Sequence, residues 1–228
     1  MERYSVHLKL LGMAVLWGAS WPMGRMLGQS LPPLTGGAVR FVLASVLLLG
    51  WLFARSRFAT LATLSARQWL GLTAAASVGV CGYAVFFMLG LQTMPAGKAA
   101  VVVAVNPVLT LLLATWFFGE RLNAKILAGM LLAVGGAIMV VTQGQPLTVL
   151  SGGINAGEWL IFGCVVCWVA YTLIGRAVLR GIDALTVTAA TSFIGALMLS
   201  AVALWTDGMP FEAMAAMDAR GWTALAWL

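Results

Sequence analysis

Charged residues are scarce in this sequence, and their scarcity excludes whole classes of protein. Lys, Arg, Asp and Glu make up 9% of the 228 residues, whereas hydrophobic residues make up 62%. A water-soluble domain carries about 25% charged residues and fewer apolar ones. The composition therefore predicts a protein whose main partner is the lipid bilayer, with its apolar surface facing lipid.

The groups that most enzymes need are also few. His7 is the only histidine, and no carboxylate pair falls inside an apolar run, so no nucleophile can be matched with a base. Cys81, Cys164 and Cys167 all lie within apolar runs, which offers no exported disulfide framework. The CxxC spacing of the last two favours packing over redox or metal chemistry. We therefore predict no enzyme activity, no metal and no cofactor.

Long apolar runs are what the sequence has in abundance. A membrane helix needs about 20 mostly apolar residues, and seven runs of that kind follow one another, with the start of an eighth. Pro and Gly mark several of the breaks, as in "SLPP" and "MPAGK". The sequence predicts an all-α polytopic membrane protein. Its expected spans are 10–27, 34–54, 69–93, 99–119, 126–142, 158–175 and 185–205.

Positive charges gather on one side of these spans. With the N-terminus in the cytoplasm, only Arg25, Lys98 and Arg220 lie outside, and Arg40 lies within the second span. This asymmetry predicts a multi-pass protein of the inner (plasma) membrane with a cytoplasmic N-terminus. It also explains the net charge of +6 without a nucleic-acid partner. The cytoplasmic set is Arg3, Lys9, Arg55, Arg57, Arg67, Arg121, Lys125, Arg176 and Arg180.

One sequence pattern occurs twice in the chain. "WGASWPMGR" from Trp17 returns as "WVAYTLIGR" from Trp168, and "ARQWLGL" from Ala66 returns as "ARGWTAL" from Ala219. Because five spans, an odd number, make up the first half, the second half must enter the membrane from the opposite side. Inverted repeats of this kind are the architecture of many secondary transporters.

The repeat also predicts a division of the chain. We expect a first five-helix repeat over 1–142, a periplasmic linker over 143–156 and a second repeat over 157–228. The last of these ends at "ALAWL", inside the counterpart of the third span and without a stop signal. The second repeat is therefore expected to be truncated, with helices 6 and 7 and the start of helix 8.

The residues from Asn106 to Val140, "NPVLTLLLATWFFGERLNAKILAGMLLAVGGAIMV", carry a family resemblance. Together with "LWGASWP" and "AVRFVLA", this stretch resembles the EamA-type transporters of the drug/metabolite transporter superfamily. The resemblance implies ten helices in two inverted repeats, of which about seven and a half are present here. It implies export of small metabolites, such as amino acids or related amphipathic solutes, by alternating access. A channel-like facilitator and a non-transporting scaffold remain alternatives, and the oligomeric state, including a homodimer, stays open.

Matching helix faces in the two halves carry candidate binding residues. In the first half the face consists of Trp17, Ser20 and Gly24, and in the second of Trp168, Tyr171 and Gly175. If these faces line a cavity, the rings offer stacking and the hydroxyls offer hydrogen bonds to a solute. An interfacial aromatic belt is the alternative, and Trp21 is expected to face lipid.

Asn106 and Pro107 form a second candidate site inside the fourth span. Proline removes one helical hydrogen bond and frees a carbonyl near residue 103, which is tolerated at membrane depth only against protein or water. The Asn106 amide can both donate and accept there. We expect a cavity-facing kink; a kink that only shapes packing is the alternative.

The remaining candidates have weaker signals. Arg40 could attract an anionic group or brace helix ends, and Tyr83 and Phe87 share a face that could add to a pocket. Glu120 and Arg121 end the fourth span, where they suit a gate or a helix-end lock. A stripe of small residues on the fifth span, Gly129, Ala133 and Gly136, is expected to allow close helix packing. With no carboxylate or histidine deep in any span, we expect uniport or exchange.

Overall fold

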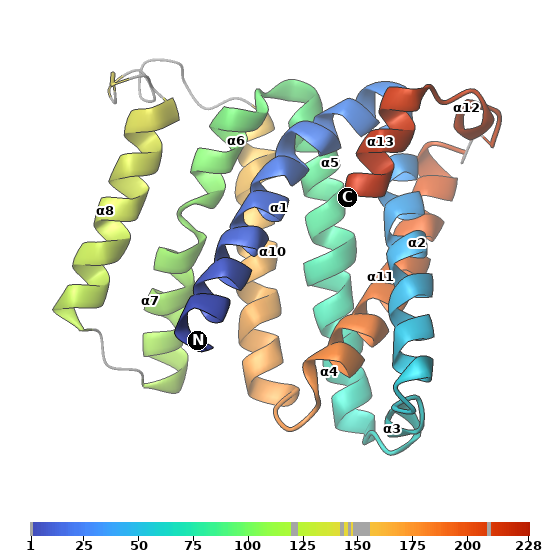
Figure 1. The fold of residues 1–228 in the computed structure, drawn as a ribbon, viewed down its shortest axis with the longest axis horizontal. Coiled ribbons are helices and arrows are strands. Elements are labelled where there is room, and N and C mark those ends of the chain that lie inside the picture. The colour runs from blue at the N-terminus through green and yellow to red at the C-terminus, as the bar shows by residue number, and fades with distance from the viewer. Residues whose placement is uncertain (1, 120–122, 142–143, 146, 148–155, 209–210) are drawn as a thin grey trace.

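The structure, a computed structural model, describes residues 2–119, 123–141, 144–145, 147, 156–208 and 211–228, and within these ranges it contains helices and no strand. The first-half elements are α1 (Glu2–Ser30), α2 (Pro33–Ala54), α3 (Ala59–Ala62), α4 (Ala66–Ala76), the π-helical η1 (Ser77–Gly82), α5 (Tyr83–Thr93), α6 (Ala96–Val103), α7 (Asn106–Phe118) and α8 (Ala124–Val141). The second-half elements are α10 (Ala156–Val178), α11 (Ala184–Thr206), α12 (Phe211–Ala215) and α13 (Ala219–Trp227). Figure 1 shows the long helices standing side by side in one bundle.

The expected spans correspond to these helices. The third is built from α4, η1 and α5 in succession, and the fourth divides into α6 and α7. Among the described residues, five stretches are long and apolar enough to cross a membrane, while α8 holds a shorter apolar stretch over Ala124–Gly136. The helices therefore confirm the prediction of an all-α polytopic membrane protein. The five stretches are Pro33–Ala54, Ala66–Thr93, Ala96–Phe118, Ala156–Val178 and Ala184–Thr206.

Segments that match in sequence run in opposite directions. In Figure 1, α1, α2 and α4 each point the opposite way to their counterparts α10, α11 and α13. The α2 and α11 pair is antiparallel by contact as well, since the start of α2 meets Asp207 after α11 and the end of α2 meets Asp183 before α11. This is the arrangement that an inverted repeat predicts. Most of the expected linker at 143–156 lies outside the described residues, so the division of the chain stays a prediction.

The two ends of the α2 and α11 pair are joined by carboxylates. Pro32 precedes α2 and gives it no side-chain cap. The Asp207 carboxylate instead accepts from the backbone N–H of Thr35 at 2.8 Å and from its hydroxyl at 3.1 Å. At the other end, Asp183 caps α11 through the N–H of Thr186 and lies 3.5 Å from the guanidinium of Arg57. Since the first N–H groups of a helix have no partner within it, these carboxylates satisfy donors that are buried here.

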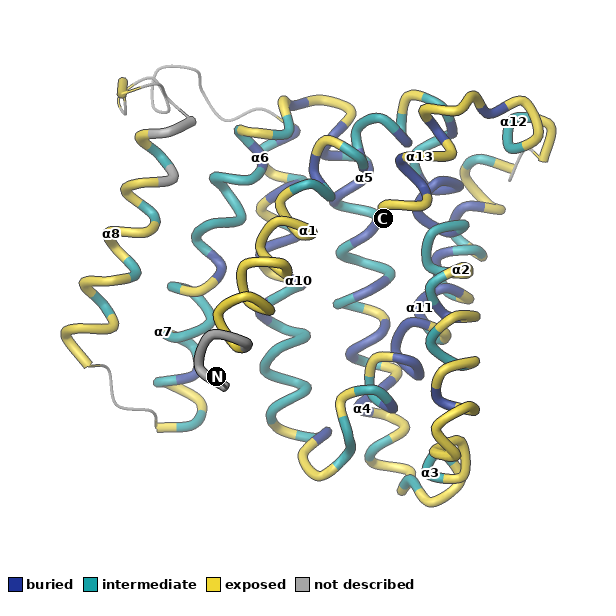
Figure 2. Tube along the Cα trace, in the orientation of Figure 1, coloured by how far each residue is buried: buried dark blue, intermediate teal, exposed yellow. Residues whose placement is uncertain are grey.

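Close helix packing occurs in the centre of the bundle. A Cβ added at Gly195 would lie 2.4 Å from Val80, and one at Gly90 would lie 2.5 Å from Ile161, so both positions require glycine. The small-residue stripe on α8 was expected to serve this purpose, and the structure corrects that expectation. Among the described residues, no atom lies within 4 Å of a Cβ added at Gly129 or Gly136. Figure 2 shows the same contrast, with burial concentrated in α5 and α11 and exposure along α8 and the first half of α1.

The charged residues separate toward the two ends of the bundle. Arg55 and Arg57 follow α2, Arg67 begins α4 and Lys125 begins α8. These element ends lie together in Figure 1, at the end where α10 also finishes. Lys98 and Arg220 lie near the starts of α6 and α13, at the opposite end. The separation is the one that the charge asymmetry of the sequence predicts.

Replacing Asp207 tests the cap that it provides across the two helices. Asp207→Ala leaves two donors of Thr35 without an acceptor, and Thr35 is fully buried. We expect a loss of about 1–3 kcal/mol, the usual cost of a buried unsatisfied polar group. The measurement is thermal unfolding of the protein in detergent. Glu212→Ala, which removes an exposed carboxylate nearby in sequence, is the control, and equal melting temperatures for both variants would contradict this role.

Acid should weaken the cap at the other end of the pair. The hydrogen bond from the Thr186 hydroxyl, helped by Arg57, holds the pKa of Asp183 below its ordinary value, against the opposing effect of burial. A lowered pKa means that the folded state favours the carboxylate, so its stabilisation is present at neutral pH and is lost as pH falls through the lowered pKa. We expect Asp183→Asn to melt below the parent at neutral pH and the difference to shrink on acidification. A difference that stays constant with pH would show that the charge is not involved.

A candidate solute cavity between the two halves

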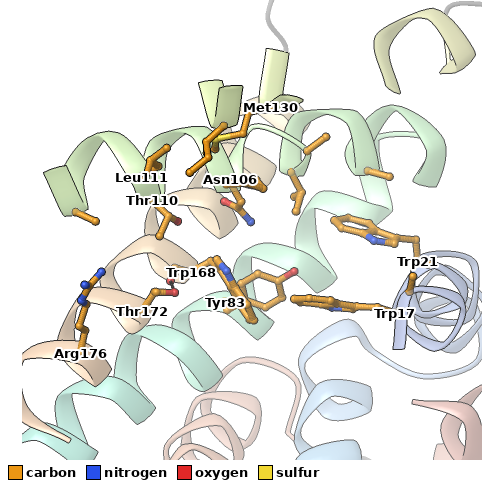
Figure 3. Close-up of a pocket in the computed structure, with 18 residues that line it drawn as sticks. Trp17, Trp21, Tyr83, Asn106, Thr110, Leu111, Met130, Trp168, Thr172 and Arg176 are labelled. Atoms are coloured by element: carbon orange, nitrogen blue, oxygen red, sulfur yellow. Dashed lines mark hydrogen bonds between the residues drawn. The ribbon is translucent and has the colours of Figure 1, made fainter. Parts of the chain in front are cut away.

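A cavity of about 870 Å³ lies between helices of the first half and α10 of the second. It extends from the middle of the bundle toward the end where α7 finishes and α8 begins. Figure 3 shows its labelled side chains converging on one space, and they come from α1, α5, α7, α8 and α10. The lining residues are Ala14, Trp17, Gly18, Trp21, Tyr83, Ala100, Val103, Ala104, Asn106, Pro107, Thr110, Leu111, Ala114, Ile126, Met130, Trp168, Thr172 and Arg176.

The tryptophans that open the two repeated strings meet in this cavity. The ring centroids of Trp17 and Trp168 are 4.9 Å apart with their planes tilted by 54°. Tyr83 lies 6.0 Å from the Trp168 ring, so three rings from α1, α5 and α10 form one wall. Such distances are in the range of favourable aromatic pairs, and the ring faces can stack on a solute. The repeat thus brings equivalent residues of the two halves into contact.

Asn106 lies beside these rings at the break between α6 and α7. Pro107 has no N–H to offer the carbonyl of Val103, four residues earlier, and the two helices part at Ala104 and Val105. The Asn106 side chain is 7% exposed, and its Oδ1 has no hydrogen-bond partner among the described residues. A buried amide oxygen without a partner costs about 1–3 kcal/mol unless a solute or water satisfies it. Asn106, Pro107 and Val103 all line the cavity.

A second proline acts in the same way on the facing helix. Pro22 lies inside α1 and leaves the carbonyl of Gly18 without its helical donor. Gly18 also lines the cavity, so two helices lose a backbone hydrogen bond beside the same space. Polar backbone at membrane depth is tolerated where it lines a cavity. Gly18 and Pro22 were not among the predicted site residues, although a proline within a span is the same signal that predicted Asn106 and Pro107.

The structure corrects the expected surroundings of Trp21. This residue was expected to face lipid, but it is 8% exposed, lines the cavity and lies 5.0 Å from the Phe87 ring. The reason is the fit of α1 against α5, where a Cβ added at Gly24 would lie 2.6 Å from Phe87. This contact turns Trp21 inward together with Trp17, one helical turn earlier.

Four further candidates lie outside the cavity lining. Ser20 lies on another side of α1, where its hydroxyl donates to the Leu16 carbonyl and it lines a separate hollow. Arg40 donates from Nε to the Leu228 carbonyl at 3.2 Å, which braces α2 against the residue after α13. Phe87 is buried behind Trp21 and Tyr83, and Tyr171 packs against Gly79 and the Trp168 ring. Phe87 and Tyr171 therefore support the cavity walls from behind, whereas Ser20 and Arg40 lie away from those walls. Glu120 and Arg121 lie outside the described residues.

Three polar lining residues were missed. Thr110 follows Asn106 by four residues, and Thr172 and Arg176 follow Trp168 by four and eight. Helical periodicity places such residues on the same face, so the spacing from the predicted residues could have found them. The Thr172 hydroxyl donates to the Trp168 carbonyl, which leaves its oxygen able to accept a hydrogen bond.

The described part of the cavity wall carries little charge. Among the described lining residues the only charged side chain is Arg176, whose guanidinium lies 4.9 Å from the centre of the Phe118 ring. Burying an ion without a countercharge costs several kcal/mol, whereas an unmatched neutral polar group costs about 1–3 kcal/mol. The described residues also contain no group of three or more His, Cys, Asp or Glu side chains that could hold a metal ion.

The bundle is closed beyond the inner end of the cavity. Lys98 of α6 and Glu158 of α10 form an ion pair there, with their side chains 36% and 14% exposed. Nearby, Arg25 of α1 donates to the Met94 carbonyl after α5 at 3.1 Å. A Cβ added at Gly157 would lie 2.6 Å from the Thr93 hydroxyl, so α10 also packs tightly against the end of α5. One ion pair, one hydrogen bond and close packing therefore join α1, α5, α6 and α10 at one end of the bundle. The cavity separates these helices toward the other end.

Comparison with known proteins identifies the family to which this chain belongs. The model of the EamA-like transporter family matches residues 5–142. The chain belongs to the EamA-like transporter family. It is 28% identical over 208 residues to the uncharacterized transporter YyaM of Bacillus subtilis (strain 168), covering 91% of this chain and 67% of that protein. It is 30% identical over 200 residues to an uncharacterized transporter of Archaeoglobus fulgidus, covering 87% and 66%.

The fold of this family member is also found among solved structures. The crystal structure of another protein superposes with a TM-score of 0.62 at 18% identity, covering 93% of this chain and 72% of that one. At this identity the likeness concerns the fold alone. The EamA-like chain spans about two thirds of the length of the curated relatives above. The family and the apolar helices establish a multi-pass membrane transporter of this class.

Proposed function

We propose that the protein carries a small organic solute across the inner (plasma) membrane by alternating access, with the central cavity as its binding site. The observation that supports this most directly is the contact between Trp17 and Trp168, equivalent residues of two oppositely directed segments, at the wall of one cavity. A site shared by two such segments can be exposed to either side when the segments rock against each other. The proposed activity is transport without chemical conversion of the solute.

The chemistry of the walls supports an amphipathic solute. Aromatic rings cover one side of the cavity, and the Asn106 amide lies beside them with its oxygen unpartnered among the described residues. Such a wall holds an apolar body by stacking and fixes its orientation through a few polar contacts. The resemblance to EamA-type exporters supports small metabolites, among them amino acids and related amphipathic solutes, with efflux as the direction.

The described conformation is the cytoplasm-facing one under this proposal. The cavity extends toward the end that carries Arg55, Arg57 and Arg67, which positive-inside topology places in the cytoplasm together with the N-terminus. The opposite end is closed by the Lys98–Glu158 pair. A channel-like facilitator would need a path open at both ends, and a scaffold would need no cavity at all, so the carrier is favoured over both.

Removing the Asn106 amide tests the binding site. Asn106→Ala takes away the polar group while Pro107 keeps the helix break, so folding and insertion should be retained. The loss of one hydrogen bond worth about 0.5–1.5 kcal/mol predicts roughly two- to tenfold weaker binding. The measurement is transport of a panel of labelled amino acids and their uncharged analogues by the reconstituted protein. Gln29→Ala, which removes an exposed amide of α1 outside the cavity lining, is the matched control. Equal transport by both variants would refute the site.

Reversing one charge of the Lys98–Glu158 pair tests the closed end. Lys98→Glu or Glu158→Lys places like charges together, which should open this end, and combining both substitutions should close it again. The measurement is labelling of a cysteine introduced at Ala100, which lines the cavity, by a membrane-impermeant maleimide added outside. The protein without that cysteine reports the background from Cys81, Cys164 and Cys167. Labelling that does not rise in either single variant would exclude the pair as a gate.

A further inference from the structure

We propose that the cavity selects an uncharged, planar solute whose edge carries an N–H donor beside a C=O acceptor, as in carboxamides, lactams and amino-heterocycles. This inference rests on the proposed function, because it takes the central cavity to be the binding site. It narrows the solute from small amphipathic metabolites in general to the uncharged members that have a flat body and an amide-like edge.

The first support is the unsatisfied amide of Asn106. Its side chain is more than nine-tenths buried, and no described residue bonds its Oδ1. Figure 3 shows the Asn106 side chain directed into the space in front of Trp168. The Oδ1 atom is itself buried in the described conformation, so a rotation about the broad terminal torsion of asparagine has to bring it to the solute beside the NH₂ group. A carboxamide is best matched by the same donor and acceptor pair in reverse, which is how asparagine pairs with an adenine edge.

The second support is the shape of the neighbouring wall. Trp17, Tyr83 and Trp168 come from three helices. The ring centroids of Trp17 and Tyr83 lie 4.9 Å and 6.0 Å, respectively, from the centroid of the Trp168 ring. Trp21 adds a fourth ring on the same side of the cavity. Rings gain most from a partner that is itself flat, because stacked and tilted arrangements both need close approach of the ring face. A planar solute beside Asn106 would have its body against these rings and its edge at the amide.

The third support is the distribution of charge. No carboxylate is found among the described lining residues, so an ammonium group in their midst would have only the ring faces to replace its hydration. Arg176, the one cation among the described lining residues, lies about two helical turns beyond Trp168 along α10, toward the mouth. A carboxylate held at Asn106 would therefore lie far from it. A zwitterion would bring both charges into this uncharged region, whereas an amide brings hydrogen-bonding groups that Asn106 can match.

Three probes that share one aromatic ring but differ in charge test whether the cavity prefers an uncharged solute. Benzamide is neutral and carries the amide edge, benzoate is an anion, and benzylammonium is a cation. Equilibrium dialysis of each labelled probe against the detergent-solubilised protein gives its dissociation constant. We expect benzamide to bind at least tenfold more tightly than either ion. The control variant is Gln29→Ala, which removes an exposed amide of α1 outside the cavity lining.

Two substitutions of similar size locate the effect at Asn106. Asn106→Leu should weaken benzamide binding about tenfold and leave no preference for it over the ions. Asn106→Asp retains the shape, guards against misfolding of the leucine variant, and should shift the preference to benzylammonium. Benzamide binding that is unchanged in both variants would overturn the assignment to Asn106.

The outcomes separate this inference from the proposed function. If benzoate or benzylammonium binds as tightly as benzamide and Asn106→Leu abolishes that binding, the solute class is wrong and the cavity remains the site. If Asn106→Leu weakens the binding of none of the probes, and solute transport is also unaffected by Asn106→Ala, both the inference and the proposed site are overturned. Benzamide preference that depends on Asn106 supports both.

Discussion

The antiparallel contact between α2 and α11 is the constraint on which the rest of this structure depends. Asp207 reaches across to the buried start of α2, and Arg57 reaches from the end of α2 to the cap of α11. Asp207 satisfies buried donors at the start of α2, and Asp183 satisfies one at the start of α11. Because the pair is held at both ends, its direction is set, and the directions of α1 against α10 and of α4 against α13 agree with it. The cavity lies between helices that this arrangement orients.

The cavity concentrates the polar features that a membrane interior otherwise excludes. Pro22 and Pro107 each remove a helical hydrogen bond beside it, and Asn106 has an unpartnered amide oxygen there. In lipid such groups would be costly, so their location at one cavity requires water or a solute to satisfy them. Most formal charges follow the opposite rule and lie toward the two ends of the bundle, with Arg40 and Arg176 as exceptions. Neutral polar groups in the middle and an ion pair at one end are what a carrier needs if its solute must leave again.

Sequence patterns predicted the helices well because hydrophobic runs and helix breakers act locally. The spans, the repeat and the break at Asn106 and Pro107 all follow from such signals, and Trp17 and Trp168 follow from the repeat itself. Which side of a helix faces the cavity was harder to predict. Ser20 and Trp21 exchanged their expected surroundings because the rotation of α1 depends on Gly24 fitting against Phe87, a contact between residues far apart in sequence. The same limit applies to the small-residue stripe on α8. Its spacing shows that a second helix could approach α8 closely, but not that any helix does so.

The closed and open ends of the bundle differ in the kind of contact they contain, and this bears on how the molecule could move. At the closed end, glycine positions and the Lys98–Glu158 pair join α10 to α5 and α6. Toward the other end, α7 and α8 border the cavity and a Cβ added at Gly129 would meet nothing within 4 Å. An ion pair can separate and become hydrated, whereas interlocked apolar packing resists sliding. A motion that opens the closed end should therefore break the ion pair and turn α10 as a unit, and it would carry Trp168 with it. The contact between Trp168 and Trp17 would then report on which side the cavity is open.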